Sequence, residues 1–251
     1  ARANADLSGD VAYVDYNGYR YQNMDLTGKI RNGNYDIELI SKDPNADLNL
    51  IASGVFNEEN PTVKLDGTIT KLDLNKLGFY AEPMILAGNI EADFTNLNPD
   101  ELNGFLNLRN FAISDTEEVF PIQDLSLNAL STIDSTKISS QSQIADLELN
   151  GKYKITQIFG SLQQTLNQYY QFQPVADTVV IDPNQYFTLD ARIKNDDLIR
   201  KFVPDLKSFE TIVINGNYDA DSRKLELNAE IPQVSYGEYL VENASLQIQN
   251  E

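Results

Sequence analysis

Adjacent carboxylates are the first residues in this sequence whose types and spacing could do chemistry. Asp100 with Glu101, and Glu117 with Glu118, could in principle serve as the acid and base of a hydrolytic reaction. We expect both pairs to lie in loops, where a solvated cluster of charges is the simpler interpretation. The chain has no histidine and no cysteine, which excludes a Ser-His-Asp triad, a cysteine nucleophile and metal sites built on those side chains. We therefore expect no catalytic residue and a protein that is not an enzyme.

One segment has the oxygen spacing of the first half of a calcium-binding loop. It begins at Asp43 and continues through Asn45 and Asp47. The sixth and twelfth positions of such a loop require glycine and glutamate, and they are occupied here by Leu48 and Gly54. Glycine-rich loops that open a helix and cradle phosphate are also missing. We therefore expect neither a metal nor a cofactor.

The charge balance narrows the possible partners. The 251 residues include 38 acidic and 19 basic ones, for a formal net charge of -19. This balance argues against nucleic-acid binding and against docking on anionic head groups, both of which need clustered Lys and Arg. The sequence has no apolar run of about 18 residues, the length that a membrane-spanning helix requires. We interpret the chain, which begins without Met, as a segment of a longer protein or a processed one.

Strict alternation of apolar and polar residues is the main structural signal. From Met84 to Ser114 it predicts two strands joined by a short turn, in which Asn98 caps a single helical turn. A glycine lies in the apolar row of both strands, between two larger residues. Seven of the 13 glycines follow this rule, which predicts a degenerate repeat of strand pairs with bulges, bends or close approaches at the glycines. The copies are Leu7-Gly9-Val11, Leu26-Gly28-Ile30, Leu65-Gly67-Ile69, Leu86-Gly88-Ile90, Leu102-Gly104-Leu106, Leu149-Gly151-Tyr153 and Ile214-Gly216-Tyr218.

The apolar spacing becomes helical in two places. It predicts an amphipathic helix near 156–172, whose stripe either packs on the sheet or acts as a lid or lipid-contacting element. A second, shorter helix is predicted over 196–203, with Asn195 as its cap and Pro204 after its end. A further helical turn is predicted over 73–80. The fold expected is a single continuous domain over residues 1–251: mainly β, an elongated and curled antiparallel sheet with one amphipathic helix and one or two short helices.

Three segments resemble the TamB family, the translocation and assembly module proteins of the AsmA-like superfamily, as found in Bacteroidota. They are residues 86–108, 147–170 and 195–206. The resemblance implies a β-taco in the periplasm, held to the inner membrane by a helix outside this chain. It also implies a role in phospholipid transport to the outer membrane and in protein assembly there, with an Omp85-type barrel as partner. The two predicted helices are a departure from the family's pattern, which is a plain, open trough.

An apolar groove for phospholipid acyl chains is the candidate site. About 30 exposed methylenes would cost on the order of 25 kcal/mol in water, at about 0.8 kcal/mol each, so a carrier needs a continuous apolar face. We expect the glycines to leave room between side chains and to let the sheet bend. The predicted lining is Leu65, Gly67, Ile69, Leu86, Gly88, Ile90, Phe94, Leu106, Leu108, Leu149, Gly151, Tyr153 and Ile155.

Two alternatives stay open at this point. The same aliphatic residues could close on one another as a dry core. The protein could also belong to another class, a cell-surface or periplasmic β module that binds a protein or glycan partner through its exposed face.

Overall fold

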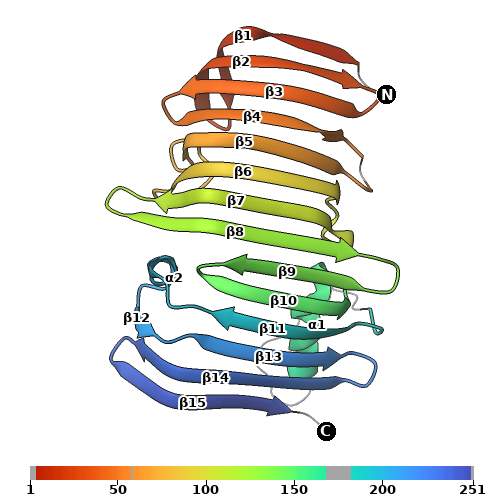
Figure 1. The fold of residues 1–251 in the computed structure, drawn as a ribbon, viewed down its shortest axis with the longest axis vertical. Coiled ribbons are helices and arrows are strands. Elements are labelled where there is room, and N and C mark those ends of the chain that lie inside the picture. Colours follow the sequence, from red (N-terminus) through yellow and green to blue (C-terminus); the bar gives the residue numbers. More distant parts are fainter. Residues whose placement is uncertain (1–3, 58, 168–181, 250–251) are drawn as a thin grey trace. The chain divides into compact units, whose positions relative to one another are not determined.

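The computed structural model describes residues 4–57, 59–167 and 182–249 (Figure 1). Its contacts group the chain into two compact units. Unit 1 comprises Ala1–Asn98 and Asn103–Leu127, and unit 2 comprises Pro99–Leu102 and Asn128–Glu251. The prediction of a mainly β, antiparallel fold with few helices is confirmed. A single domain over the whole chain stays a prediction.

Unit 1 is an antiparallel meander in which each strand pairs with the next one along the chain. Asn32 and Gly33 both have positive φ, 52° and 89°, as a two-residue hairpin turn formed by Asn-Gly requires. The strands are β1 (Ala5–Tyr16), β2 (Tyr19–Arg31), β3 (Asn34–Asp43), β4 (Ala46–Val55), β5 (Thr62–Asp73), β6 (Ile85–Asn96), β7 (Asn103–Ser114) and β8 (Val119–Ser131), of which β8 continues into unit 2.

A line of β-bulges crosses the strands of unit 1, and we call it the crease. The register shifts between Asp47 and Leu48, between Ile69 and Leu72, and around Gly88, each time beside the shift of the neighbouring strand. Asn23 in β2 and Asn110 in β7 have left-handed backbones, with φ of 55° and 49°, at the same level of the sheet. Each bulge reverses which face the following residues occupy and bends its strand. Of the five pattern glycines in unit 1, Gly88 alone lies on this line, so most of the bends occur away from the glycines.

The segment over 74–80 lies in the connection between β5 and β6. It is a hydrogen-bonded turn, in which Leu77 N donates to Asp73 O at 3.0 Å, the bond between residues four apart that the predicted single helical turn requires. The Asn17 side chain donates to the carbonyl oxygens of Leu77 and Gly78 at 3.3 and 2.9 Å. Leu77 is 0% exposed, so this turn carries its own small core.

Unit 2 is also antiparallel. β9 (Thr136–Ser142), β10 (Ala145–Lys152), β11 (Tyr186–Ile193), β13 (Ile212–Asp219) and β14 (Lys224–Tyr236) pair in that order, and β15 (Tyr239–Gln249) pairs with β14. The short β12 (Leu206–Phe209), which the sequence did not predict, pairs with the last residues of β14. The non-strand elements are η1 (Pro99–Glu101), α1 (Ile155–Asn167) and α2 (Asp197–Phe202).

The helices differ from the predictions in detail. α1 begins one residue early and is described to Asn167; the predicted remainder, including Tyr169 and Tyr170, lies outside the described residues. Phe159, one of the apolar residues of the predicted stripe, is 78% exposed, so it does not pack on the sheet. The cap of α2 is Asp196, because its extended backbone lets its carboxylate accept from Leu198 N. The prediction of Asn195 as the cap is therefore wrong.

Candidate functional site

Strand pairing brings the predicted lining residues of unit 1 onto one surface, the apolar face of unit 1. Residues paired across antiparallel strands point to the same side, so each row of partners is continuous. Gly67, for example, pairs with Leu50 on one side and Ile90 on the other, and Ile90 pairs with Leu108. The central row is Gly9, Leu26, Leu39, Leu50, Gly67, Ile90 and Leu108, and the row beside it is Leu7, Gly28, Ile37, Ala52, Leu65, Ala92 and Leu106.

The degree of burial distinguishes this face from an ordinary core. Seven of the nine predicted residues in unit 1 are half-buried: Leu65, Gly67, Leu86, Gly88, Ile90, Leu106 and Leu108. Ile69 and Phe94 are buried, at 8% and 7% exposed. Unit 1 has no helix among its described residues, so the partial burial comes from neighbouring strands and turns. The described residues therefore cover this face only in part.

Two of the predicted glycines allow neighbouring strands to approach each other closely. A Cβ on Gly67 would lie 2.3 Å from Asn49 O, and one on Gly104 would lie 2.1 Å from Asp93 O. Real Cβ atoms do not approach backbone that closely, so only glycine fits. The neighbouring strand, rather than a bound molecule, requires these glycines.

The opposite face of unit 1 is polar. Thr68 donates to Asn89 Oδ1 at 2.9 Å, and Arg109 forms an ion pair with Glu91 at 3.0 Å. A hollow of about 270 Å³ lies over these residues, lined mainly by carboxylate, amide and hydroxyl side chains. In unit 2 a hollow of about 490 Å³ lies on the equivalent polar face, beside Asp146, Asp190 and Arg192.

Only some of the predicted lining residues of unit 2 share a face. Leu149 pairs with Ile138 and Leu189, and Gly151 pairs with Phe187, so both belong to an apolar face. Tyr153 follows the end of β10. Ile155 is the first residue of α1, so its prediction as part of a strand row is wrong. The chain leaves the sheet there because Lys152 is the last residue of β10 that pairs with β11.

Tyr153 belongs to an aromatic cluster that the sequence did not reveal. Its ring meets Phe187 edge-on at 6.0 Å, and Phe187 lies 5.1 Å from the Tyr218 ring. Tyr153 is 4% exposed, and this burial raises the pKa of its phenol well above the ordinary range. The three aromatic residues are far apart in sequence, so only the strand register could identify them as a cluster.

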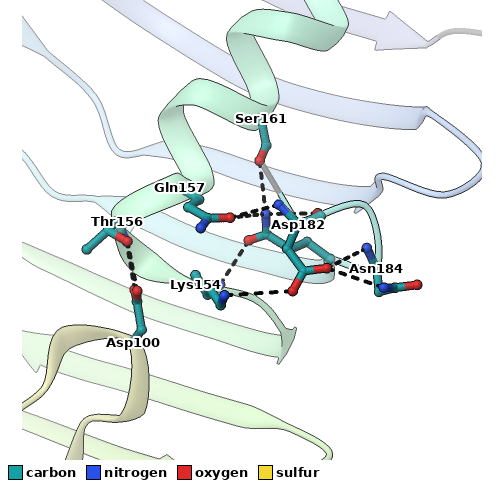
Figure 2. A network of polar contacts seen from close by, with 8 residues as sticks. Asp100, Lys154, Thr156, Gln157, Ser161, Asp182 and Asn184 are labelled. Carbon is teal, nitrogen blue, oxygen red and sulfur yellow. Dashed lines mark hydrogen bonds and ion pairs between the residues drawn. The ribbon is translucent and has the colours of Figure 1, made fainter. Parts of the chain in front are cut away.

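Polar contacts hold the first half of α1 (Figure 2). The buried Gln185 side chain donates to Gln157 Oε1 at 3.1 Å and to Ser161 Oγ at 3.2 Å, and its own Oε1 accepts from Lys154 N. Tyr218 Oη donates to Ser161 O at 3.4 Å, which places the helix against the aromatic cluster. α1 therefore covers one end of the apolar face of unit 2.

Of the adjacent acidic residues in the sequence, Asp100 accepts hydrogen bonds from another segment, whereas Glu117 and Glu118 are exposed. The Asp100 carboxylate in η1 accepts from both the backbone N and the hydroxyl of Thr156 at 3.0 Å, which caps α1 from another segment. Glu117 and Glu118 lie in an exposed turn whose N–H groups donate to Asp115. Asp182, which also contacts the α1 region, accepts from Asn184 N. That hydrogen bond, and more weakly Lys154, lowers its pKa.

Asp43, the first position of the calcium-like segment, is enclosed by protein donors. It is 1% exposed and accepts from Tyr19 Oη at 2.7 Å, from Gln22 N at 3.0 Å and from Asn45 N at 2.8 Å. The first two bonds tie the start of β2 to the end of β3, and the third closes the turn that leads into β4. Protein donors therefore satisfy this buried carboxylate.

Comparisons with known proteins identify no relative of this chain. Among the described residues, no helix has the length and apolar character to cross a membrane. No protein-family model, curated protein or solved structure matches this chain.

Proposed function

We propose that this chain is the periplasmic part of an inner-membrane-anchored envelope protein that shields phospholipid acyl chains on the apolar face of its sheet. It would thereby support lipid transport to the outer membrane and protein assembly there, with an Omp85-type barrel as partner. The protein would work as a carrier or scaffold and not as an enzyme. The assignment to the cell envelope and to this partner depends on the resemblance to the TamB family.

The observation that carries the proposal is the half-buried, helix-free apolar face of unit 1. Its rows cross seven paired strands, β1 to β7. At about 4.8 Å between strands, such a row is about 29 Å long. One leaflet of a bilayer has a hydrocarbon depth of about 15 Å, half of a core of about 30 Å. The face is therefore long enough to accompany a whole acyl chain.

The charge pattern favours recognition of the chain over the head group. The polar face of unit 1 alternates acidic and basic side chains, as in the Glu91–Arg109 and Asp93–Lys64 pairs. With a net charge of -19, the protein has no excess of basic residues to attract anionic head groups. Apolar contact remains as the main attraction that this surface offers to a lipid.

The polar hollows favour the second candidate, a module that binds a protein or glycan. The hollow over Thr68, Asn89 and Asn107 presents the hydroxyl and amide groups that hydrogen-bond to sugars or peptides. Under this alternative the apolar face would serve only the stability of the sheet.

A pair of photo-crosslinkers on neighbouring residues tests the two candidates. A photoreactive amino acid at Ile90 lies on the apolar face, and one at Asn89 lies on the polar face of the same strand. In cells or in vesicle suspensions, we expect phospholipid adducts at position 90 and none at position 89, measured by mass spectrometry.

Either of two results would overturn acyl-chain binding. The first is no lipid adduct at position 90 while the protein is folded, as judged by circular dichroism. The second is equal lipid capture at both positions, which would indicate collision instead of binding. Protein or glycan adducts concentrated at position 89 would favour the second candidate.

A further inference from the structure

The hollow on the polar face of unit 2 has the size of a small-molecule site. Its volume is about 490 Å³, and sites for small ligands usually measure about 300–1,000 Å³. Strands β9, β10, β11 and β13 form it, and cross-strand pairing places its side chains in two adjacent rows. The first row is Ser139, Glu148, Asp190 and Asn215, and the second is Gln141, Asp146, Arg192 and Val213.

The three acidic side chains of this hollow have partners within the protein. Glu148 forms an ion pair with Lys137 at 2.8 Å, and Asp146 forms one with Lys194 at 2.7 Å. The Asp190 carboxylate accepts a hydrogen bond from an amide side chain of β13. Lysine therefore neutralises two of the three carboxylates, which lowers the repulsion that an anion would meet here.

Arg192 is the charged side chain of the hollow that the protein leaves unpaired. Its guanidinium has no ion pair and no hydrogen bond among the described residues. Asp146 lies directly opposite Arg192, but Lys194 holds that carboxylate and also donates to Ser142 O at 2.7 Å. A guanidinium presents its N–H donors as a planar fork that matches a carboxylate. The hollow therefore offers donors for an anion from outside the protein.

The other lining groups indicate what kind of anion would fit. In the hollow of unit 1 the corresponding guanidinium, that of Arg109, is already paired with Glu91 at 3.0 Å, so anion recognition would be particular to unit 2. Hydroxyl and amide side chains surround Arg192, and they both donate to and accept from sugar hydroxyls. Val213 is the apolar side chain of the two rows, so the hollow offers little to the apolar side chains of a peptide.

We propose that the hollow of unit 2 binds a sugar that carries a carboxylate, such as a uronic acid unit of a polysaccharide. The carboxylate forms two parallel hydrogen bonds with Arg192, and the sugar hydroxyls bond to Ser139, Gln141 and Asn215. Acyl-chain binding is not required for this interaction, because the hollow lies on the polar face of its sheet.

Two disaccharides test the proposal with the whole chain. Digalacturonate and galactobiose differ in the carboxylates of the former, and calorimetry measures the binding of each. We expect digalacturonate to bind at least about tenfold more tightly. Arg192→Gln should remove this preference, and Arg192→Lys should keep only part of it, because an ammonium group does not form the paired hydrogen bonds. Lys207→Gln, at an exposed residue outside the hollow, is the matched control and should change binding less than about twofold.

Further probes separate a sugar site from attraction for any anion. Acetate, inorganic phosphate and a tetraglutamate peptide should each bind at least about tenfold more weakly than digalacturonate. The proposal is overturned if the folded wild type does not bind digalacturonate, or if galactobiose or any of these three probes binds as tightly. Equal losses in Lys207→Gln and Arg192→Gln would also overturn it. The comparison of ligands uses the wild type, so it stays decisive even if a variant fails to fold.

Discussion

At the residue scale, the residue type that a position in this sheet tolerates depends on which atoms of the adjacent strand lie close to it. Gly104 and Gly9 belong to the same sequence pattern, yet a Cβ meets backbone at 2.1 Å in the first and open space in the second. The pattern alone assigns them the same role. The distinction depends on which side of each strand is occupied.

Gly104→Ala should therefore be much more damaging than Gly9→Ala. The new methyl group would clash with Asp93 O, and φ of 143° is unfavourable for alanine. We expect Gly104→Ala to lower the free energy of unfolding by about 2–3 kcal/mol and Gly9→Ala to change it by less than about 0.5 kcal/mol. Urea denaturation followed by circular dichroism measures both. Equal effects would mean that the contact with Asp93 does not constrain Gly104.

Tyr153 should make stability depend on alkaline pH. Burial raises its pKa, so above its ordinary pKa of about 10 the unfolded chain loses the phenolic proton while the folded chain keeps it. The folded state then binds more protons, and stability must fall as the pH rises; below that range Tyr153 is neutral in both states and contributes no slope.

Tyr153→Phe removes this contribution. Between pH 9 and 11, we expect unfolding midpoints of the variant to decline less steeply than those of the wild type, while the two are similar at pH 7. Tyr239→Phe, at a tyrosine that is 77% exposed, is the control and should leave the slope unchanged. Identical slopes for Tyr153→Phe and the wild type would contradict the prediction.

At the element scale, α1 depends on a cap from a distant segment. Asp100 accepts two hydrogen bonds from Thr156 in the first turn of α1, where a carboxylate also complements the positive end of the helix. The sequence shows Asp100 only as one of two adjacent acids. Its role follows from the position of η1 beside the start of α1 in unit 2.

Asp100→Ala should loosen α1 without unfolding the sheet. We expect a loss of about 1–2 kcal/mol, seen as faster hydrogen exchange of the α1 amides while the β10 and β11 amides stay protected. Asp134→Ala, an exposed acid of the same unit, is the control and should leave exchange unchanged. Unchanged exchange in α1 after Asp100→Ala would show that the cap contributes little.

The crease is a second feature at the element scale, because it consists of bulges in several neighbouring strands. Asn110 has φ of 49°, a region in which glycine is comfortable and β-branched residues are not. We expect Asn110→Val to cost about 1–2 kcal/mol and Asn110→Gly to cost less than about 0.5 kcal/mol in thermal or urea unfolding. If Asn110→Val were the milder change, side-chain burial would matter more than the backbone at this position.

At the scale of the whole molecule, the proposed binding of acyl chains depends on the apolar face of unit 1. Ile90→Gln places an amide in the middle of the central row, and Asn107→Gln, the control, only lengthens an amide side chain on the polar face. In a titration with a fluorescent fatty acid, we expect Ile90→Gln to weaken binding by about tenfold, or about 1.4 kcal/mol, and Asn107→Gln to leave it unchanged. Equal binding by all three proteins would locate the ligand elsewhere.

The sequence by itself determined the class of fold, most strand positions and the side of its strand that each apolar residue occupies. Strict alternation is a local property of the backbone, because successive side chains of a strand point to opposite faces. The alternation over 86–94 is therefore enough to place Leu86 and Ile90 on one side. The lack of His and Cys in the sequence likewise limits the possible chemistry, because thiolate nucleophiles and imidazole bases need those side chains.

Only the tertiary structure decided how deeply the apolar rows are buried and where the sheet bends. It also decided which residues pack or cap at the ends of strands and helices. The crease depends on register shifts between strands, and the cluster of Tyr153, Phe187 and Tyr218 depends on pairing across β10, β11 and β13. The departure of Ile155 from the sheet and the cap at Asp196 likewise depend on hydrogen bonds that alternation does not encode. Periodicity tells which side of a strand a residue occupies, whereas burial depends on what other segments place above it.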